Sequence, residues 1–446
     1  MVTIAGHLLL TCSKKASVPE VAEVSSVLIA SMPFSYGLEK LEPAFEDRAI
    51  PYIAYGAPFD FLAAQHIKDT LNASRVYIVC STSLAKNTNA LSRLQHSLQH
   101  AGIEVVGTRT GFSPHTRWNQ VVDCANDARP KNPEVIITLG AGSLTDAVKV
   151  ICWMLANDID TGEKLNEMLD KSKADQWKQP IVRQVAIPTS LSGGEYQALA
   201  GITRDDGSDE KCGFLPPAKN PSLVILDPEL TTTTPERIWL STGVRAIDHC
   251  VETLCSLQSN EKGDAAAEKG LKRLVPGLIR TKHDMKDADA RFETMMGVIE
   301  AMDAVGSGVP LGASHAIGHQ LGPLGVGHGE TSCVNLPAVC KWNAAQNANN
   351  DRQSNCLKIL LEDPVTRKLI EDKLGHESAE KADLGDVLDI IIRELGMPRT
   401  LKEVNVSRDK FDILAKNSLG DIWIQTNAKP ITEKEQVLEI LEMVAE

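Results

Sequence analysis

The chain has 446 residues, and this length favours two domains over a single hydrophobic core. Hydrophobic residues at 43% and charged residues at 24% are typical of a folded globular protein and exclude both disorder and collagen-like order. The formal net charge of −13 argues against nucleic-acid binding, because phosphate backbones require clustered lysine and arginine. We therefore expect a small molecule as the partner.

Ten cysteines are scattered along the chain, and no two of them form a Cys-x-x-Cys pair. Such a pattern is typical of reduced thiols inside the cell. The amino-terminal stretch IAGHLLLTC lacks a preceding cationic segment and is too short for a membrane span or a signal peptide. We expect a cytoplasmic protein with no membrane partner, and import into an organelle is left open.

The first half alternates between short apolar runs and helical patterns. Apolar, β-branched runs occupy residues 75–81, 134–142 and 183–190, and segments of helical periodicity separate them. Continuous apolar strands joined by helices predict a parallel sheet that is covered on both faces. We therefore expect an α/β domain over residues 1–230, with residues 1–45 as a candidate extension.

The second half shows helical periodicity and few β-branched runs. The segment DVLDIIIRELG, residues 386–396, ends in a glycine that is typical of a helix stop. Thr432 and Glu435 have the spacing of a capping box at the start of the last helix. We therefore expect an all-helical domain over residues 231–446.

Two loops in the first half combine glycines and hydroxyls at the carboxyl ends of predicted strands. The first loop holds Gly140, Ala141, Gly142 and Ser143 before a helix start, where small residues and free N–H groups suit a diphosphate. The second loop, residues 186–197, is rich in serine and glycine and suits a nicotinamide or phosphate contact. Each loop alone is also compatible with an ordinary turn, but ligands of open α/β sheets bind at this edge.

Seven segments together resemble the iron-containing alcohol dehydrogenase superfamily in order and spacing. They are GAGSLTDAVK, IPTSLSGGE, GITRDDGSDEKCG, LVILDPELT, TGVRAIDHCVE, HAIGHQLG and HGETSCVNLP, and the resemblance covers roughly residues 45–446. PTSLSGGE and HGET are most similar to its maleylacetate reductase branch. The resemblance implies a nucleotide-binding α/β domain with a parallel sheet, an all-α second domain, and a nicotinamide cofactor between them. We also expect a homodimer.

The resemblance assigns cofactor contacts to residues of both loops. The pyrophosphate turn would be lined by Gly140, Ala141, Gly142, Ser143 and Asp146, the nicotinamide side by Thr189, Ser190 and Gly193, and the ribose by Lys211. In this family an acidic residue after an earlier strand often holds the adenosine ribose, but Ser81, Thr82 and Ser83 occupy that place. NADPH is therefore allowed beside NADH, and we favour NADPH. The alternative is a solvated loop with no influence on that choice.

Four histidines form the second candidate site. His315 and His319 are four residues apart and share one helix face, His249 lies on another predicted helix, and His328 follows a glycine-rich turn. Converging imidazoles are a normal way to hold Zn²⁺ or Fe²⁺. In metal-dependent members of the superfamily, the positions of His249, His315 and His328 bind the metal together with an aspartate, and Arg245 stands in the aspartate position here.

Arg245 argues against a metal. A guanidinium about 4 Å from a cation repels it by roughly 4 kcal/mol even at an effective dielectric of 20. Asp248 is a poor substitute ligand, because it projects about 100° away from His249 around the helix. The spacing from His319 to His328 is also one residue shorter than is usual in the metal-binding members. We predict that a divalent metal is absent, and the alternative keeps the three histidine ligands with Arg245 turned outwards.

Without a metal, Arg245 can bind a carboxylate or enolate oxygen, and a histidine can supply the proton. His319 and His249 are the candidate general acids, and an ion pair with Glu252 or a solvated side chain is the alternative for Arg245. We therefore predict an NAD(P)H-dependent, maleylacetate reductase-like enzyme that transfers hydride to an activated C=C or C=O of a small substrate. The alternatives are a metal-dependent alcohol or aldehyde dehydrogenase, a dehydroquinate synthase-like lyase, and a nucleotide-binding protein without activity.

Overall fold

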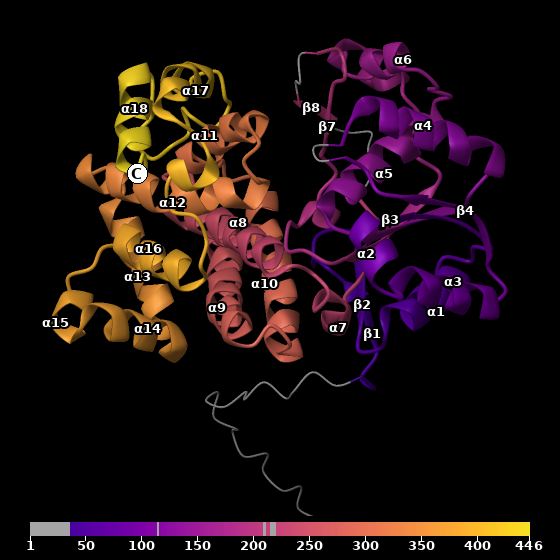
Figure 1. The fold of residues 1–446 in the computed structure, drawn as a ribbon, viewed down its shortest axis with the longest axis horizontal. Coiled ribbons are helices and arrows are strands. Elements are labelled where there is room, and N and C mark those ends of the chain that lie inside the picture. Colours follow the sequence, from indigo (N-terminus) through magenta and orange to yellow (C-terminus); the bar gives the residue numbers. More distant parts are fainter. Residues whose placement is uncertain (1–35, 114–115, 208–210, 215–219) are drawn as a thin grey trace, which may run out of the picture. The chain divides into compact units, whose positions relative to one another are not determined.

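The computed structural model describes residues 36–446 except 114–115, 208–210 and 215–219 (Figure 1). Most of the candidate extension, residues 1–45, therefore lies outside the described residues. The first described elements are the strands β1 and β2, which pair antiparallel at the edge of the main sheet.

A seven-stranded sheet organises the first half of the chain. Its strand order is β1-β2-β9-β6-β5-β3-β4, and every pair except β1 with β2 is parallel. The strands are β1 Lys40–Pro43, β2 Tyr52–Tyr55, β3 Arg75–Cys80, β4 Glu104–Thr110, β5 Val135–Gly140, β6 Arg183–Pro188 and β9 Leu223–Ile225. Two further strands, β7 Ala200–Thr203 and β8 Lys211–Phe214, form a separate antiparallel pair.

Helices cover both faces of this sheet, as the apolar runs predict. The helices are α1 Phe59–Asp69, α2 Thr82–Asn87, α3 Ala90–His100, α4 Trp118–Ala128, α5 Gly142–Ala156 and α6 Gly162–Glu167. Successive residues of β3 enter different cores: Ile78 packs with α1 and α3, whereas Tyr77 and Val79 pack with α4 and α5. Because side chains alternate along a strand, a strand that is buried on both faces is mostly apolar, and the buried Thr138 of β5 and Gln184 of β6 are exceptions.

The second half is helical. Its helices are α7 Pro228–Thr231, α8 Glu236–Cys255, α9 Glu261–His283, α10 Ala288–Gly306, α11 Ala313–Leu321, α12 His328–Ala345, α13 Asn350–Glu362, α14 Pro364–Leu374, α15 His376–Ala379, α16 Leu384–Glu394, α17 Phe411–Ser418 and α18 Lys434–Met443. The glycine stop after α16 is confirmed, since Gly396 adopts a φ of +69°. The capping box of α18 lies one residue later than predicted, at Glu433 and Gln436, because the side chain of Gln436 bonds the backbone N–H groups of residues 432 and 433.

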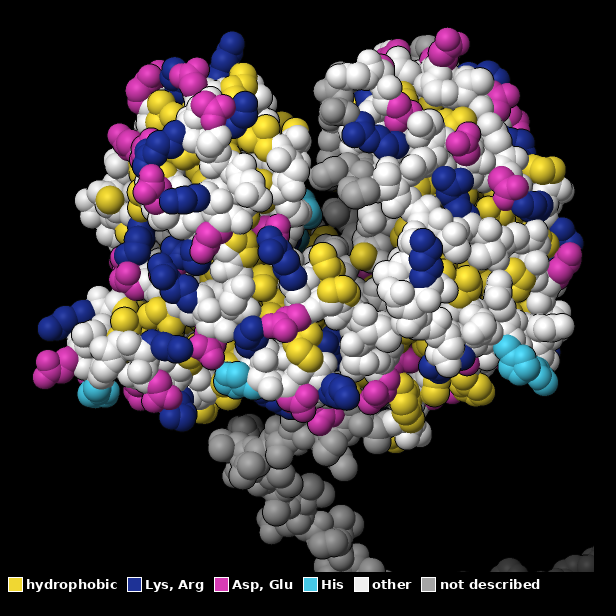
Figure 2. All heavy atoms as spheres, in the orientation of Figure 1, with side chains coloured by type: hydrophobic (Ala, Val, Ile, Leu, Met, Phe, Trp, Pro, Cys, Tyr) yellow, Lys and Arg dark blue, Asp and Glu magenta, His cyan; other side chains and the backbone are white. Residues whose placement is uncertain are grey.

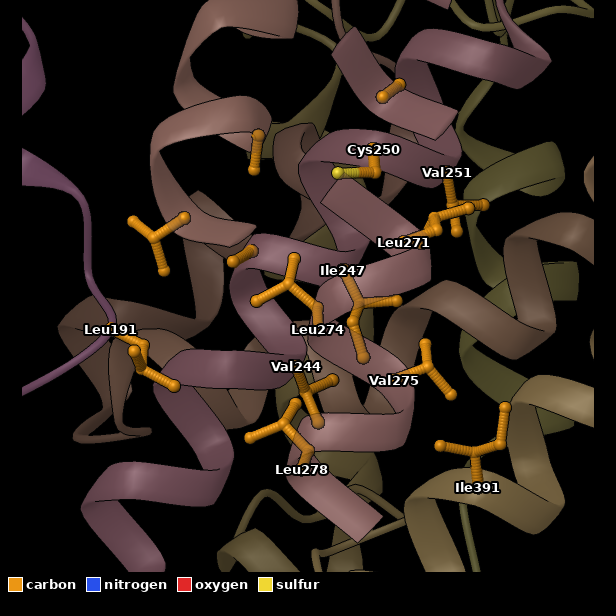
Figure 3. Close-up of a cluster of buried hydrophobic side chains, with 14 of the residues drawn as sticks. Leu191, Val244, Ile247, Cys250, Val251, Leu271, Leu274, Val275, Leu278 and Ile391 are labelled. Atoms are coloured by element: carbon orange, nitrogen blue, oxygen red, sulfur yellow. The ribbon is translucent and has the colours of Figure 1, made fainter. Parts of the chain in front are cut away.

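Helix α8 lies at the centre of the largest hydrophobic core (Figure 3). Val244, Ile247 and Val251 recur at helical spacing on α8 and pack with Leu271 and Leu274 of α9. The same core includes Ile53, Ala186 and Val224 of the main sheet, so the two halves share buried surface. β9 is the last strand among the described residues, and only helices follow it. This change agrees with a domain boundary near residue 230, which stays a prediction.

The surface carries charges of both signs. On the face drawn in Figure 2, basic and acidic side chains of the described residues are interspersed instead of gathered by sign. None of the described helices is long and apolar enough to cross a membrane.

Candidate functional site

A charged face of α8 is buried beside the apolar one. Arg245, Asp248 and Glu252 follow each other at helical spacing, and their exposed fractions are 3%, 0% and 8%. They lie one residue along from Val244, Ile247 and Val251, which turns this face by about 100° from the apolar face. Buried charges are costly unless they find partners, so this face must be satisfied from other elements.

Serines from two other helices donate hydrogen bonds to one carboxylate oxygen of Asp248. Nη1 of Arg245 donates to Oγ of Ser332 in α12 at 3.0 Å and lies 3.9 Å from Oδ2 of Asp248. That same Oδ2 accepts hydrogen bonds from Ser332 at 2.5 Å and from Ser314 of α11 at 2.9 Å. Asp248 therefore belongs to the cluster. The expectation that its side chain points away from the candidate site is wrong. Asp248 diverges from His249, but residues three apart on a helix share a face, and this brings it to Arg245.

Glu252 binds the start of α11. Its carboxylate accepts hydrogen bonds from the backbone N–H of Gly312 at 2.9 Å and of Ser314 at 2.8 Å. Oε2 also lies 2.7 Å from Nδ1 of His315. A carboxylate at a helix N-terminus is favoured by the helix dipole and by its unpaired N–H groups. Glu252 thus positions His315, and Arg245 has its ion-pair contact with Asp248 instead of with Glu252.

Three of the four predicted histidines come together. The rings of His249 and His315 stack with centroids 4.8 Å apart, and Trp423 lies 5.8 Å from His315 and 5.1 Å from His319. Nδ1 of His319 is 2.8 Å from Oδ2 of Asp421. His328, in contrast, is an exposed residue at the first position of α12.

Burial sets the protonation of the cluster. It raises the pKa of Asp248 to about 8 and that of Glu252 to about 7, and repulsion between the carboxylates adds to the shift of Asp248. Burial also lowers the pKa of His249 and His315 well below the usual histidine range, and the charge of Arg245 lowers both further. At neutral pH both imidazoles are therefore neutral and part of the carboxyl population keeps its proton.

Donor atoms for a cation are present, but they differ from the predicted set. Ligand atoms of Asp248, Glu252 and His315 lie within 4.8 Å of one another and are buried. Oδ1 of Asp248 and Nε2 of His315 lack hydrogen-bond partners among the described residues. The set implied by the resemblance does not fit, because Arg245 replaces its carboxylate. The guanidinium, close to Asp248, also opposes a cation at the alternative set.

The glycine turn lies where β3, β5 and β6 end side by side. Gly140 has a φ of +147°, and a Cβ there would lie 2.9 Å from Cβ of Ser81. The carbonyl of Gly140 accepts a hydrogen bond from the N–H of Thr189 at 3.1 Å. Helix α5 begins at Gly142 after Ala141, whose side chain makes no cap hydrogen bond, so no capping side chain competes with a ligand for the N–H groups of the first turn.

The second loop packs against the first loop and against the helical half. A Cβ on Gly142 would lie 3.1 Å from Cβ of Ser192, and a Cβ on Gly193, with φ +72°, would meet Met302 of α10 at 2.8 Å. Thr189 and Ser190 are buried. The carbonyl of Thr189 accepts from Oγ1 of Thr234 at 2.6 Å. Only glycine allows this close approach without displacing a neighbour.

The structure places the three other residues assigned to the cofactor in different surroundings. Ser143 is exposed at the second position of α5. The carboxylate of Asp146 accepts from the N–H of Gly201 at 3.1 Å and contacts Nζ of the buried Lys149 at 3.4 Å, so it joins α5 to β7. Lys211 begins β8, but its side chain lies outside the described residues.

Sequence reasoning missed the residues that support the histidines. Ser332 lies within the segment HGETSCVNLP and Ser314 directly precedes His315, but nothing in the spacing of either serine marks it as a partner of Asp248. Asp421 and Trp423 belong to a loop about a hundred residues from His319, where no periodicity or motif spacing marks them. Such residues become visible only when the chain is folded.

Comparisons with known proteins agree with this fold. The family model "Iron-containing alcohol dehydrogenase" matches residues 60–228, and the model "Fe-containing alcohol dehydrogenase family, C-terminal" matches residues 239–445. "Dehydrogenase FUM7" of Gibberella moniliformis (strain M3125 / FGSC 7600) is 36% identical over 419 residues, which cover 89% of this chain and 96% of that protein.

Solved structures show the same fold. A 1,3-propanediol oxidoreductase matches with a TM-score of 0.74 and 23% identity, over 87% of this chain and 97% of that chain. A maleylacetate reductase from Agrobacterium tumefaciens matches with a TM-score of 0.67 and 22% identity, over 93% and 98% of the two chains. At these identities the likeness concerns the fold alone.

Proposed function

Since the chain belongs to the iron-containing alcohol dehydrogenase family and is an NAD(P)-dependent oxidoreductase, we propose that it is a reductase of the maleylacetate reductase type. It transfers hydride to an activated C=C or C=O bond of a small substrate that carries a carboxylate, and it works without a metal ion. The observation that carries this proposal is Arg245, a buried guanidinium beside two neutral imidazoles.

Arg245 has the properties needed to stabilise developing negative charge. Its guanidinium is permanently charged, and its Nε is buried without a hydrogen-bond partner among the described residues. An unsatisfied buried donor is costly, and an incoming carboxylate or enolate oxygen would satisfy it. The reduced nicotinamide, when bound, supplies the hydride. The residues of the cluster then have to neutralise the oxygen that receives the electron pair and return one proton to the product.

The proton donor is better assigned to His319 than to His249. The lowered pKa of His249 keeps that ring neutral at pH 7, because burial and the neighbouring charge of Arg245 oppose protonation. The side chain of His319 is 36% exposed, so it can exchange protons with solvent and with a reactant, and its Nδ1 bonds the carboxylate of Asp421. His249 and His315 then act by stacking and by excluding water around Arg245.

A metal-dependent alcohol or aldehyde dehydrogenase is the second candidate. It is favoured by the proximity of Asp248, Glu252 and His315, whose carboxylate and imidazole donors suit Zn²⁺ or Fe²⁺. Against it, Nη1 of Arg245 lies 3.9 Å from Oδ2 of Asp248, so a metal ion bound by Asp248 would lie close to the guanidinium. Two like charges about 4 Å apart repel each other by roughly 4 kcal/mol at an effective dielectric of 20. Oδ2 of Asp248, Oε2 of Glu252 and Nδ1 of His315 are also engaged in hydrogen bonds with the chain itself, whereas Oδ1 of Asp248 and Nε2 of His315 have no partner among the described residues.

We further propose that NADPH is the preferred cofactor and that the enzyme is a cytoplasmic homodimer. Ser81 caps α2 at the end of β3, and no carboxylate at that position would repel a 2′-phosphate. The described cysteines are all free and buried, which suits a reducing compartment. Turnover measured separately with NADPH and NADH tests the first point, and light scattering of the purified protein tests the second.

Elemental analysis of the purified protein, together with activity before and after EDTA, tests metal independence. We expect substrate-dependent oxidation of NAD(P)H, less than stoichiometric zinc or iron, and no effect of EDTA. Stoichiometric metal with EDTA-sensitive turnover would instead establish the second candidate. Product formation without net change in the nicotinamide would favour a lyase.

The substitution Arg245→Asp tests the role of the guanidinium directly. It restores a carboxylate at the ligand position, so we expect it to increase metal affinity and to lower native turnover by about 100-fold or more. Arg393→Asp, on the exposed side of α16, is the matched control and should alter neither. Unchanged turnover in Arg245→Asp would make the arginine a bystander.

A further inference from the structure

The loop between α17 and α18 reaches His319 through Asp421. Oδ2 of Asp421 lies 2.8 Å from Nδ1 of His319, and Oδ1 accepts a hydrogen bond from the N–H of Trp423 at 3.0 Å. The N–H of Asp421 itself donates to the carbonyl of Ser418 at 3.1 Å. Both carboxylate oxygens and the backbone are therefore engaged, and the carboxylate cannot rotate away from the imidazole without losing a hydrogen bond.

The rest of the loop is tied to the helix that carries His319. Oγ1 of Thr426 donates to the carbonyl of Leu311 at 2.6 Å, and Oδ1 of Asn427 accepts from the N–H of Ala313 at 3.3 Å. The indole of Trp423 lies 5.1 Å from the ring of His319 at an angle of 38°. The loop thus holds the carboxylate, one face of the ring and the start of α11 in a fixed relation.

A carboxylate at Nδ1 decides which nitrogen carries the proton. An ionised carboxylate only accepts hydrogen bonds, so Nδ1 of His319 must be the protonated nitrogen of the neutral ring. Nε2 then holds the lone pair, so it takes up a proton from solvent and passes that proton to the reactant. His315 is arranged alike, with Glu252 at its Nδ1, but His315 is buried and packed between His249 and Trp423. His319 is the more exposed of the two rings.

We propose that Asp421 is a positioning residue that fixes the tautomer and the orientation of His319. This inference rests on the proposed function, in which His319 returns the proton to the product. Asp421 does not touch the reactant, and its effect passes through the imidazole. Its role resembles that of the carboxylate that orients a catalytic histidine in hydrolases, where the carboxylate selects the tautomer and stabilises the imidazolium.

Nitrogen-15 NMR of the full chain, labelled in the histidine rings, measures the tautomer without any assay of activity. The signals of His319 are identified by their loss in His319→Gln. In the wild type we expect a protonated Nδ1 and an unprotonated Nε2 when the ring is neutral. Asp421→Asn keeps an oxygen for the N–H of Trp423 and places an NH2 donor at Nδ1 of His319, so it should shift the ring toward the tautomer protonated on Nε2. Unchanged ring signals in Asp421→Asn would overturn the proposal.

Kinetics then separate positioning from folding. We expect kcat of Asp421→Asn to fall about 10- to 100-fold with KM changed less than about 3-fold, and Asp421→Glu to recover part of the loss. Asp412→Asn, an exposed carboxylate of α17 bonded to Lys434, is the control and should leave both kcat and the ring signals unchanged. A tautomer shift with unaltered kcat would contradict the role of His319 as proton donor, whereas an unaltered tautomer contradicts the role of Asp421.

Discussion

The two candidate sites of this molecule are built in opposite ways. The loops after β5 and β6 offer backbone, glycines and hydroxyls, and the residues that make each loop are neighbours in sequence. The histidine cluster combines buried charged residues of α8 with polar residues of α11, α12 and the loop before α18, which are far apart in sequence. A site made of backbone depends on local conformation, whereas a site made of charges depends on partners brought by the whole fold.

This contrast predicts different sensitivities. Substitution in the glycine loops should act through steric exclusion of a ligand and through backbone strain. Substitution in the cluster should act through charges that are left without partners, which is the costlier effect in a protein interior. Four substitutions test the contrast.

The largest effect is expected from Arg245→Leu. Removal of the guanidinium leaves the carboxylates of Asp248 and Glu252 without a buried countercharge, which costs about 3–5 kcal/mol in the free energy of unfolding. Urea denaturation followed by circular dichroism measures the change. The exposed Arg393, paired with Asp389 on α16, is the control, and Arg393→Leu should change the stability by less than about 0.5 kcal/mol. Equal effects of the two substitutions would show that the buried charges are not coupled.

Gly140→Ala should have the next largest effect. Its positive φ and the nearby Ser81 predict strain of about 1–3 kcal/mol, and the displaced turn should raise the Kd of the nicotinamide cofactor at least about 10-fold. Isothermal titration calorimetry measures that Kd. Gly162→Ala at the start of α6 meets no atom within 4 Å and is the control. Tight cofactor binding by Gly140→Ala would remove this turn from the cofactor site.

The stability of the protein should fall as the pH rises from about 6.5 to 8. Glu252 and Asp248 have folded-state pKa values raised by burial, so the native state holds protons that the unfolded state has already released. Their stabilisation is complete below the ordinary carboxyl pKa and is lost as the pH passes the raised values. The lowered pKa values of His249 and His315 act in the opposite direction, but only below about 6.5.

Each carboxyl contributes a slope of up to about 1.4 kcal/mol per pH unit in that window. Glu252→Gln removes one of the two contributions, so its free energy of unfolding should vary less with pH than that of the wild type. Urea denaturation across the window measures both slopes. Parallel curves would show that Glu252 ionises normally in the folded protein.

The smallest effect is expected from Ser81→Asp. Aspartate caps a helix as well as serine does, so α2 and the stability should be preserved. The new carboxylate would repel a 2′-phosphate and raise the KM for NADPH about 10-fold relative to that for NADH, which corresponds to about 1.4 kcal/mol. Steady-state kinetics with the two cofactors decide this, and an unchanged ratio would favour the alternative that this loop has no influence on cofactor choice.

Much of the fold could be predicted from local pattern. The apolar runs at β3, β5 and β6 predicted a parallel sheet covered on both faces, because a strand with two buried faces consists mostly of apolar residues. The motifs also placed Arg245 on a helix with His249, and His315 with His319. The error at Asp248 arose because its direction was compared with His249 alone, although the helix presents it to Arg245 and to serines of α11 and α12.

The sequence by itself determined the order of strands and helices, the glycine turns and the arginine that replaces a carboxylate. These features depend on hydrophobic periodicity and on backbone conformation, and both are encoded by residues close to one another in the chain. Only the tertiary structure decided which groups surround that arginine. Partners such as Glu252 with α11 and Asp421 with His319 are separated by 60 to 102 residues, so packing and the cost of unpaired buried charge select them.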